Sequence, residues 1–449
     1  MPGRDWGKTG AGFASLLQAG GGADGTEAKR DPEKKGAFVG IGPTEQLSTR
    51  CCIVGGGPAG MMLGLLLGRA GIEVVVLEKH GDFLRDFRGD TIHPSTLELM
   101  HELGLLEALL KLPHQEVARL KAWFGNTELT LADFTHLPTH CRFIALMPQW
   151  DFLDFLAREA SRHPAFRLRM QTEATDVIEQ AGRIVGVRTK TPVGVLEVRA
   201  DLVIGADGRH SIVRQAAGLA VEELGAPLDV LWFRLPRFSG DPEDTSIRFG
   251  SGQLLVLLNR GEYWQAGYGI AKGSREEIRK EGLPELRRHI AALAPFAPDR
   301  IGELDDWAKI KLLTVRVDRL QRWYRPGLLC IGDAAHAMSP VGGVGINLAI
   351  QDAVAAANLL TEPLRTRTLT ATHLRRVQRR RELPTRIIQR LQIVVQNHVI
   401  ANVLAGRGTL RPPLLLRVIG RLPGFRRLTG RLVGIGIRPE HIRTPARRA

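Results

Sequence analysis

The sequence predicts an α/β fold with an inserted β-sheet domain and a helical, arginine-rich carboxyl-terminal segment. Three observations support this prediction. Residues 51–80 read as strand, glycine-rich turn, helix and strand; residues 230–273 contain successive β-rich runs; and residues 361–449 combine helical periodicity with 20 Arg, no Lys and 3 Glu. An apolar fraction of 44% in 449 residues is enough to bury large cores in two or three domains.

The first element is a βαβ unit whose turn carries Gly55, Gly57 and Gly60 in the spacing G-x-G-x-x-G. The first glycine permits the tight turn, the second lets the backbone approach a pyrophosphate, and the third packs the helix on the strand. Glu78 ends the second strand, where a carboxylate accepts hydrogen bonds from ribose hydroxyls and repels a 2′-phosphate. The unit is therefore Rossmann-like and is expected to bind FAD or NAD in preference to NADP.

Two later motifs distinguish FAD from NAD as the expected cofactor. The stretch "DLVIGADGRHSIVRQAAGL" (201–219) has a strand followed by Asp207 and Gly208, with Ser211 and Arg214 in the next turn. The stretch "CIGDAAHAMSPVGGVGINLAIQDA" (330–353) has an apolar strand, a glycine-rich loop and a helical pattern that begins near Asn347. Glycine-rich loops at the carboxyl end of a strand usually approach a cofactor closely.

Taken together in this order, the three motifs resemble those of the flavin-dependent aromatic hydroxylases, including para-hydroxybenzoate and ubiquinone-biosynthesis hydroxylases. The resemblance runs from about Cys51 to about Leu360. It implies bound FAD, NADH or NADPH as co-substrate, and O₂ activated as a flavin C4a-hydroperoxide. The implied reaction is hydroxylation of an electron-rich aromatic ring, and the largely apolar runs of 230–273 favour a lipophilic aromatic or quinone-like substrate. No metal is required, because the flavin carries the chemistry.

The resemblance also implies residue roles. Gly332 and Asp333 match the pair whose carboxylate accepts hydrogen bonds from the flavin ribityl hydroxyls, and Pro340 matches the proline beside the flavin reactive edge. The glycines around Gly343 would let the backbone lie against the ring. The segment Gly345, Ile346 and Asn347 matches the helix start whose amide groups face the ring, where a helix amino terminus stabilises negative charge.

The resemblance implies roles for four further residues, and His336 is a separate candidate. Arg88 aligns with an arginine that contacts the FAD pyrophosphate, and Gln149 sits where the family places another FAD contact. Asp207, with Gly208, is implied in handling both FAD and NAD(P)H. His336 follows the Gly-Asp pair and is either a catalytic residue or a structural, hydrogen-bonded histidine. No proton-transfer base can be named from the sequence.

The motifs and the intervening runs predict a chain that enters each domain more than once. We expect a disordered extension (1–48), three parts of the FAD-binding domain (49–120, 146–220 and 316–360), two contributions to the substrate domain (121–145 and 221–315), and a basic helical region (361–449).

The charge distribution limits the partners. Residues 361–449 carry a net charge of +17, so the other 360 residues carry −2 of the total of +15. A nucleic-acid groove would need positive charge across a folded face, so none is expected. Residues 385–404 place apolar side chains on one helical stripe, either as a cap on the FAD-binding domain or as a segment on an anionic membrane surface: Ile388, Leu391, Val395, Val399 and Val403.

Cysteine usage and the amino terminus favour a cytoplasmic location. Four cysteines, two of them adjacent, form neither a disulfide framework nor a zinc pattern, and residues 1–48 lack the apolar core of a signal peptide. The absence of a redox-active cysteine pair excludes a disulfide reductase. Two alternatives stay open: a prenyl or geranylgeranyl-type reductase on the same scaffold, and a non-catalytic flavoprotein scaffold in a membrane-associated biosynthetic assembly.

Overall fold

The computed structural model describes residues 44–446, apart from 85–89, 295, 297, 405 and 407–421. The chain divides into two units, Met1–Ile41 and Gly42–Ala449, and every element below belongs to the second unit.

The first layer is an open sheet with the strand order β19-β20-β11-β1-β2-β8. Strands β20, β11, β1, β2 and β8 pair in parallel, which is the arrangement expected when helical crossovers connect successive strands. The predicted Rossmann-like fold is therefore confirmed. The bounds are β1 Thr44–Val54, β2 Val74–Leu77, β8 Phe166–Arg169, β11 Gly194–Gly205, β19 Tyr324–Arg325 and β20 Leu328–Cys330.

A β-meander extends this sheet on one side. Strand β9 (Glu173–Gln180) pairs antiparallel with β10 (Arg183–Thr191), and β10 pairs antiparallel with the first half of β11. The same half of β11 pairs in parallel with the beginning of β1, from Thr44 onward. Residues 44–48, which the sequence analysis placed in a disordered extension, thus belong to a strand because β11 supplies their backbone partners. Residues 1–43 of that extension lie outside the described residues.

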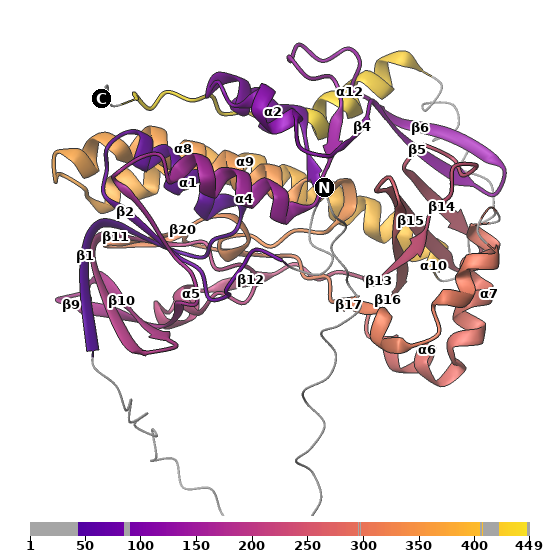
Figure 1. Cartoon of the computed structure of the whole chain (residues 1–449), viewed down its shortest axis with the longest axis horizontal. Coiled ribbons are helices and arrows are strands. Elements are labelled where there is room, and N and C mark those ends of the chain that lie inside the picture. The colour runs from indigo at the N-terminus through magenta and orange to yellow at the C-terminus, as the bar shows by residue number, and fades with distance from the viewer. Residues whose placement is uncertain are drawn as a thin grey trace, which may run out of the picture. The chain divides into compact units, whose positions relative to one another are not determined.

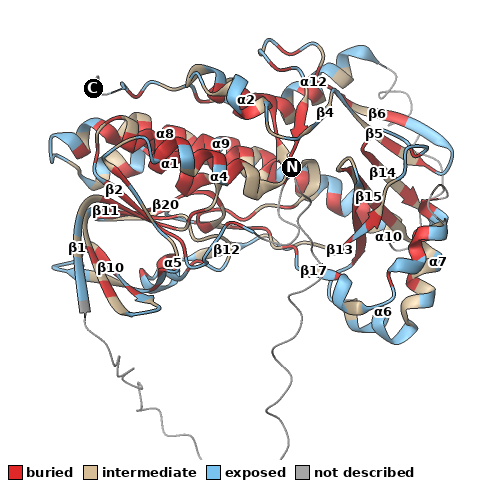
Figure 2. Ribbon diagram, viewed as in Figure 1, coloured by how far each residue is buried: buried red, intermediate tan, exposed pale blue. Residues whose placement is uncertain are grey.

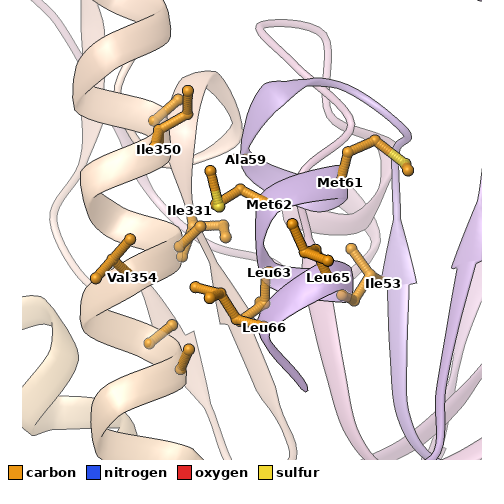
Figure 3. Packing of buried hydrophobic residues seen from close by; sticks show 14 of the residues in the cluster. Ile53, Ala59, Met61, Met62, Leu63, Leu65, Leu66, Ile331, Ile350 and Val354 are labelled. Carbon is orange, nitrogen blue, oxygen red and sulfur yellow. The ribbon is translucent and has the colours of Figure 1, made fainter. Parts of the chain in front are cut away.

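Four helices cover one face of the open sheet (Figure 1): α1 (Pro58–Arg69), α4 (Gln149–Ala160), α8 (Gly345–Arg365) and α9 (Ala371–Val395). Their contact with the sheet forms the largest apolar core. Figure 3 shows Met62 and Leu66 of α1 beside Ile331, with Ile350 and Val354 of α8 across from them. This packing fixes the start of α1 and the start of α8 relative to the carboxyl end of β20.

The second layer is a seven-stranded sheet with the order β17-β13-β16-β15-β14-β5-β6. Helices α6 (Arg275–Glu281) and α7 (Leu283–Leu293) lie on its outer side, where their outward faces are exposed (Figure 2). Its strands come from the two regions predicted to form the substrate domain, although β5 starts two residues before the expected boundary at 121. They are β5 Arg119–Phe124, β6 Thr127–Asp133, β13 Leu228–Pro236, β14 Ser246–Gly250, β15 Gln253–Asn259, β16 Tyr263–Ala271 and β17 Lys311–Leu313.

Short elements connect the two layers. Strands β3, β7 and β4 form a three-stranded sheet, and β12 pairs with β18. The predicted boundary at 145 falls inside β7, which joins β3 and β4 and not the seven-stranded sheet. The bounds are β3 Thr91–Ile92, α2 Pro94–Glu102, α3 Leu106–Leu110, β4 Gln115–Val117, β7 Ile144–Leu146, α5 Ile212–Ala216, β12 Val221–Glu223, η1 Pro298–Glu303, η2 Trp307–Lys309, β18 Asp318–Leu320, η3 Gly332–Ala334 and η4 Val341–Gly343.

The carboxyl-terminal region packs on both layers. Helix α9 continues through a π-helical turn, η5 (Gln396–Ile400), into α10 (Ala401–Leu404). Helix α12 (Pro423–Gly434) lies against β6, so closely that a Cβ on Gly430 would stand 2.0 Å from the backbone oxygen of Asp133. The described part of this region is therefore a cap, one of the two interpretations left open by the sequence.

The members of the predicted apolar stripe on this region differ in burial. Ile388 is buried, but the side chains of Leu391 and Val395 are 41% and 39% exposed. Glutamine side chains occupy the buried face at these turns. Of the described helices, the segment Val341–Arg365 is long and apolar enough to cross a membrane, and 72% of its apolar window is buried in the protein, as in a core helix.

Candidate functional site

The three sequence motifs meet at the carboxyl ends of β1, β11 and β20. A Cβ on Gly332, which follows β20, would lie 3.3 Å from Cβ of Ala59 in α1 and 3.1 Å from Cβ of Ala349 in α8. A Cβ on Gly55, which follows β1, would lie 2.3 Å from the backbone oxygen of Ala206, which follows β11. Ligands of open α/β sheets bind at this edge, next to the ends of the parallel strands.

The glycine turn after β1 has the shape that a dinucleotide needs. Gly55 has a φ of +109°, which an L side chain rarely adopts, and a Cβ on Gly60 would stand 1.9 Å from the oxygen of Gly55. Gly57 differs, because no described atom lies within 4 Å of the position of its missing Cβ. The backbone at the start of α1 therefore leaves open space where a pyrophosphate can approach the helix amino terminus.

Glu78 lies beside this turn and is 9% exposed. One carboxylate oxygen accepts a hydrogen bond from the backbone N–H of Gly56 at 3.0 Å. The other accepts from the backbone N–H of His80 at 3.1 Å and contacts its Nδ1 at 2.6 Å. The carboxylate is thus fixed at the end of β2, in the position where the dinucleotide fold holds a ribose.

Asp207 follows β11 and keeps one buried oxygen without a partner. Its Oδ2 accepts a hydrogen bond from the backbone N–H of Val213 at 3.2 Å, whereas Oδ1 has no hydrogen-bond partner among the described residues. Burial raises the pKa of Asp207, against the opposing hydrogen bonds from Ser211 and the start of α5. An unpartnered buried acceptor is uncommon, and a hydroxyl or amide of a bound cofactor would satisfy it.

The second motif is tied to the third by Arg214, whose role the sequence analysis did not identify. Its guanidinium donates two hydrogen bonds of 3.2 Å to the two oxygens of Asp318, and it also reaches the backbone oxygen of Ala334 at 3.4 Å. Both partners of the ion pair are at most 3% exposed. A planar fork that binds a carboxylate in this way fixes the loop after β20 to the loop after β11.

The third motif begins with Gly332 and Asp333 in η3. Gly332 has a φ of +58° and donates its backbone N–H to Asp352 at 3.1 Å. Asp333 is half-buried, at the edge where the three loops meet. His336 follows and is 1% exposed; its Nε2 contacts Asp352 at 2.5 Å. Because His336 is enclosed on the protein side of the loop, its contacts favour the structural role over the catalytic one.

Asp352 is the centre of a buried charged network. Its second oxygen accepts a hydrogen bond of 3.0 Å from Nε of Arg381 in α9. Burial alone would raise the pKa of Asp352, but His336 and Arg381 together hold the pKa below its ordinary value. The carboxylate is therefore ionised and binds the loop after β20 to α8 and α9.

The predicted helix start is held mainly by protein contacts. Helix α8 begins at Gly345, two residues before the expected Asn347. The Asn347 side chain accepts hydrogen bonds from the backbone N–H of His93 at 3.0 Å and from Oγ1 of Thr96 at 2.7 Å, and donates to the oxygen of Thr91 at 3.3 Å. A cofactor contact from Asn347 would therefore come from its backbone.

The loop just before this helix supports the predicted close approach of backbone to a ring. Gly343 has a φ of +64°, and a Cβ there would stand 2.5 Å from Oγ1 of Thr91, which donates to the oxygen of Gly343 at 2.8 Å. Pro340 is half-buried directly before η4, and Gly345 and Ile346 are half-buried at the start of α8. All four residues lie in the segment 340–346, which leads into α8.

Gln149 and Arg88 are the two other predicted FAD contacts. Gln149 begins α4, and its backbone N–H donates to Asp90 at 3.3 Å. Arg88 lies outside the described residues.

An ion pair that the sequence did not indicate joins the two layers. The guanidinium of Arg260, from the turn between β15 and β16, stands 2.5 Å from the carboxylate of Asp90. Both side chains are at most 5% exposed, and burial raises the pKa of Asp90 against the attraction of Arg260.

These observations fit FAD. The open space at Gly57, the carboxylate of Glu78 at the end of β2 and the orphaned oxygen of Asp207 are arranged along one edge of the sheet. Asp333 and the half-buried edge from Pro340 to Ile346 follow along the chain at the same edge. The donor and acceptor set matches a dinucleotide at one end and a planar ring system at the other.

Comparison with known proteins gives the same result. Residues 48–391 match the family model described as an FAD binding domain. The chain is 32% identical over 395 residues to 6-methylpretetramide 4-monooxygenase of Streptomyces rimosus, covering 87% of this chain and 93% of that one. It is 26% identical to 3-demethoxyubiquinol 3-hydroxylase of Escherichia coli, covering 70% of this chain and 79% of the relative.

The fold is shared with solved structures. The anhydrotetracycline hydroxylase from Streptomyces rimosus superimposes with a TM-score of 0.70 at 20% identity, covering 87% of this chain and 77% of that chain. At this identity the likeness concerns the fold, and it includes both layers described above.

Proposed function

Because the chain belongs to the FAD-dependent aromatic hydroxylases and is an FAD-dependent monooxygenase, we propose that it hydroxylates a fused-ring phenolic substrate with NAD(P)H as reductant. Bound FAD supplies the redox chemistry by which one oxygen atom of O₂ is inserted into the ring. The proposal for the substrate rests on one observation, the composition of the inner face of the seven-stranded sheet.

Part of this inner face is an apolar wall. Val230 and Trp232 of β13 lie opposite Gly269 and Gly267 of β16, and the Trp232 ring covers Gly267 so closely that a Cβ there would meet it at 3.1 Å. The same cluster includes Val341, which directly follows Pro340. Apolar side chains that meet the proposed edge of the flavin favour a ring system without charged substituents at this end.

The other end of the inner face is polar. Arg234 stacks on the ring of Tyr263 at 4.9 Å, and Nε of Arg260 donates to Gln265 at 3.2 Å. Nη1 of Arg260 is buried without a hydrogen-bond partner among the described residues. A phenolic oxygen would accept a hydrogen bond from this Nη1. The inner face thus suits a substrate that is apolar along its rings and oxygenated at one edge.

One relative supports this proposal by its printed name. That name, 6-methylpretetramide 4-monooxygenase, gives 6-methylpretetramide as the compound on which the relative acts. We further propose that strands from 119–133 and 228–313 act as the substrate domain. The proposed FAD contacts are Gly55, Gly57, Gly60, Glu78, Arg88, Gln149, Asp207, Gly208, Gly332, Asp333, Gly343, Gly345, Ile346 and Asn347, with Pro340 at the reactive edge.

The function is tested with the holoprotein and a panel of probes. FAD is reduced anaerobically by NADH or NADPH with naphthol, a hydroxyanthraquinone or 4-hydroxybenzoate present, and isotopically labelled O₂ is then admitted. We expect fused-ring phenols to speed reduction and to gain one labelled oxygen. If only 4-hydroxybenzoate is hydroxylated, the substrate class is wrong. A prenyl probe that gains hydrogen without labelled oxygen would support the reductase, and no turnover of any probe would support the scaffold.

A second proposal concerns location, namely peripheral association with an anionic membrane from the cytoplasmic side. Its support is the outward face of α9, where apolar side chains are exposed beside the exposed arginines Arg386 and Arg390. Each arginine near an anionic surface contributes on the order of 1 kcal/mol. The exposed apolar side chains are Leu383 (46%), Leu391 (41%), Val394 (54%) and Val395 (39%).

Sedimentation with vesicles tests this location. The full chain is expected to sediment with vesicles that contain anionic lipid at low salt, less so at high salt, and not with neutral vesicles. A variant with Leu391→Gln and Val394→Gln should sediment less. If this variant sediments as well as the parent, or if neither binds at low salt, the membrane proposal is excluded while the enzymatic function is unaffected.

A further inference from the structure

Glutamines form part of the buried face of α9 and of the π-helical turn that follows it. Gln378, Gln389, Gln392 and Gln396 are between 0% and 8% exposed, whereas Leu391 and Val394 of the same helix face outward. The last three glutamines are spaced at i, i+3 and i+7, which places them on one stripe. The π-helical turn η5 begins at Gln396 and adds a residue to the turn that follows this stripe.

Each of these three glutamines donates to the loop between β20 and α8. Nε2 of Gln389 donates to the backbone oxygens of Asp318 at 2.8 Å and Ala337 at 3.0 Å. Nε2 of Gln392 donates to the backbone oxygens of Ser339 at 3.0 Å and Val341 at 2.9 Å. The backbone carbonyls of every second residue from 337 to 341 therefore accept hydrogen bonds from side chains of α9.

Gln396 completes the row at the side chain of Ser339. Its Nε2 donates to Oγ of Ser339 at 2.5 Å, and the same Oγ accepts the backbone N–H of Val341 at 3.2 Å. Pro340 stands between the two carbonyls that Gln392 binds. It has no backbone N–H of its own, so its position depends on the bonds made by its neighbours.

The amides of this row are only half satisfied. Oε1 of Gln389, of Gln392 and of Gln396 is buried without a hydrogen-bond partner among the described residues. The unpaired acceptors are destabilising, whereas the N–H groups of Gln389 and Gln392 satisfy loop carbonyls that an apolar side chain would leave unpaired. Three such amides in one row, each donating to the same loop, indicate that the position of the loop is what they provide.

We infer that Gln389, Gln392 and Gln396 are positioning residues that fix the Pro340 edge against the flavin ring. The inference rests on the proposed placement of FAD along this loop and extends it to a helix that does not itself contact the cofactor. Loss of one glutamine lets the loop shift, so the ring environment changes while the adenosine half of FAD stays bound. The glutamines thereby set the spectrum and the midpoint potential of the bound flavin.

The test compares two buried glutamines of the same helix. Gln392→Met removes two donors to the loop and keeps the length of the side chain. Gln378→Met is the matched control, because Gln378 is equally buried and also makes two hydrogen bonds, but to Trp323 N and Gln321 O. Both holoproteins are examined by thermal melting, by visible absorption of the bound flavin and by reductive titration against a reference dye.

We expect both variants to melt at a lower temperature, and only Gln392→Met to shift the flavin spectrum and the midpoint potential. The affinity for FAD should fall on the order of tenfold in Gln392→Met, the change that two ordinary hydrogen bonds are worth. Equal flavin shifts in both variants, or none in either, would overturn the inference. If Gln392→Met does not fold, Gln396→Met and Ser339→Ala decide by the same criteria. Loss of bound FAD from wild-type protein would instead contradict the proposed function.

Discussion

The two ends of the proposed FAD site are built in different ways. The adenosine end is formed by Gly55, Gly57 and Gly60 within one turn, where the backbone itself makes the shape. The flavin end is a loop whose carbonyls are bound by glutamines 51 to 53 residues further along the chain. The first end is limited by steric fit inside a local motif, and the second depends on side chains from a distant helix.

This difference determines how each end fails. At the adenosine end, a substitution acts through a single clash or through the space left for the ligand. At the flavin end, a substitution releases hydrogen bonds or exposes a buried charge, so stability and cofactor environment change together.

Of the substitutions that test this comparison, Arg381→Met, at the flavin end, is expected to lower the unfolding free energy most. Arg381 is 1% exposed, and its removal leaves the fully buried carboxylate of Asp352 with only His336 and the N–H of Gly332. Breaking a buried pair in this way costs about 3–5 kcal/mol of unfolding free energy. Urea unfolding measures the change. Arg386→Met is the control, because its pair with Glu382 is exposed and worth about 1 kcal/mol or less. Equal losses of unfolding free energy in the two variants would contradict a stabilising role for the buried network around Asp352.

The second effect is a pH dependence from His93, which joins the start of α2 to α12 through the oxygen of Val433. Burial lowers the pKa of His93 to about 4, against the opposing hydrogen bond to Val433. Between about pH 6.5 and pH 4 the unfolded chain binds a proton that the folded chain does not, so stability falls as the pH falls. The loss is about 3 kcal/mol over this window.

Urea unfolding at several pH values between 4 and 7 measures this slope for the wild type and for His93→Gln. The variant should lose most of the wild-type decrease, and His398→Gln, at an exposed position, should keep it. A wild-type slope in the His93→Gln protein would mean that other groups cause the acid sensitivity.

The third prediction concerns Asp333, which is proposed to bind the ribityl chain between the adenosine end and the flavin end of FAD. Asp333→Ala should weaken FAD binding by roughly 1.5–3 kcal/mol, because the ribityl hydroxyls lose a charged acceptor. Titration of the apoprotein with FAD, followed by flavin fluorescence, measures the affinity. A variant that keeps stoichiometric FAD after extensive dialysis, at unchanged affinity, would remove Asp333 from the site.

The smallest effect is expected on the outward face of α9. Leu391→Gln should change the unfolding free energy by about 0.5 kcal/mol or less and leave FAD affinity unaltered, because this side chain is 41% exposed. A larger loss, measured in the same urea assay, would show that this face packs against another part of the protein.

The adenosine end could be predicted from the sequence because its geometry is local. Gly55, Gly57, Gly60 and Glu78 occur within one βαβ unit. Gly55 and Gly60 have a steric requirement that no other residue meets, and Gly57 leaves open space for a ligand. The loops after β1, β11 and β20 share one edge because these strands are parallel and therefore end on the same side of the sheet.

The flavin end could not be predicted in the same way. The hydrophobic pattern placed Ile388, Leu391 and Val395 on one helical stripe and left open whether that stripe packs on the protein or lies on a membrane surface. The loop before α8 carries carbonyls that need donors, and this requirement placed Gln389 and Gln392 inside and Leu391 outside. The same holds for Arg214 and Arg381, whose partners lie on other elements.

The most direct test of the two-ended site is the binding of ADP, the adenosine half of the cofactor, to apoprotein by isothermal titration calorimetry. Gly57 has φ −73° and open space at its Cβ, so Gly57→Ala should melt like the wild type and lose ADP binding. Gln392→Met should bind ADP as the wild type does while altering the spectrum of bound FAD. Equal loss of ADP binding in both variants, or loss in Gln392→Met alone, would contradict the account.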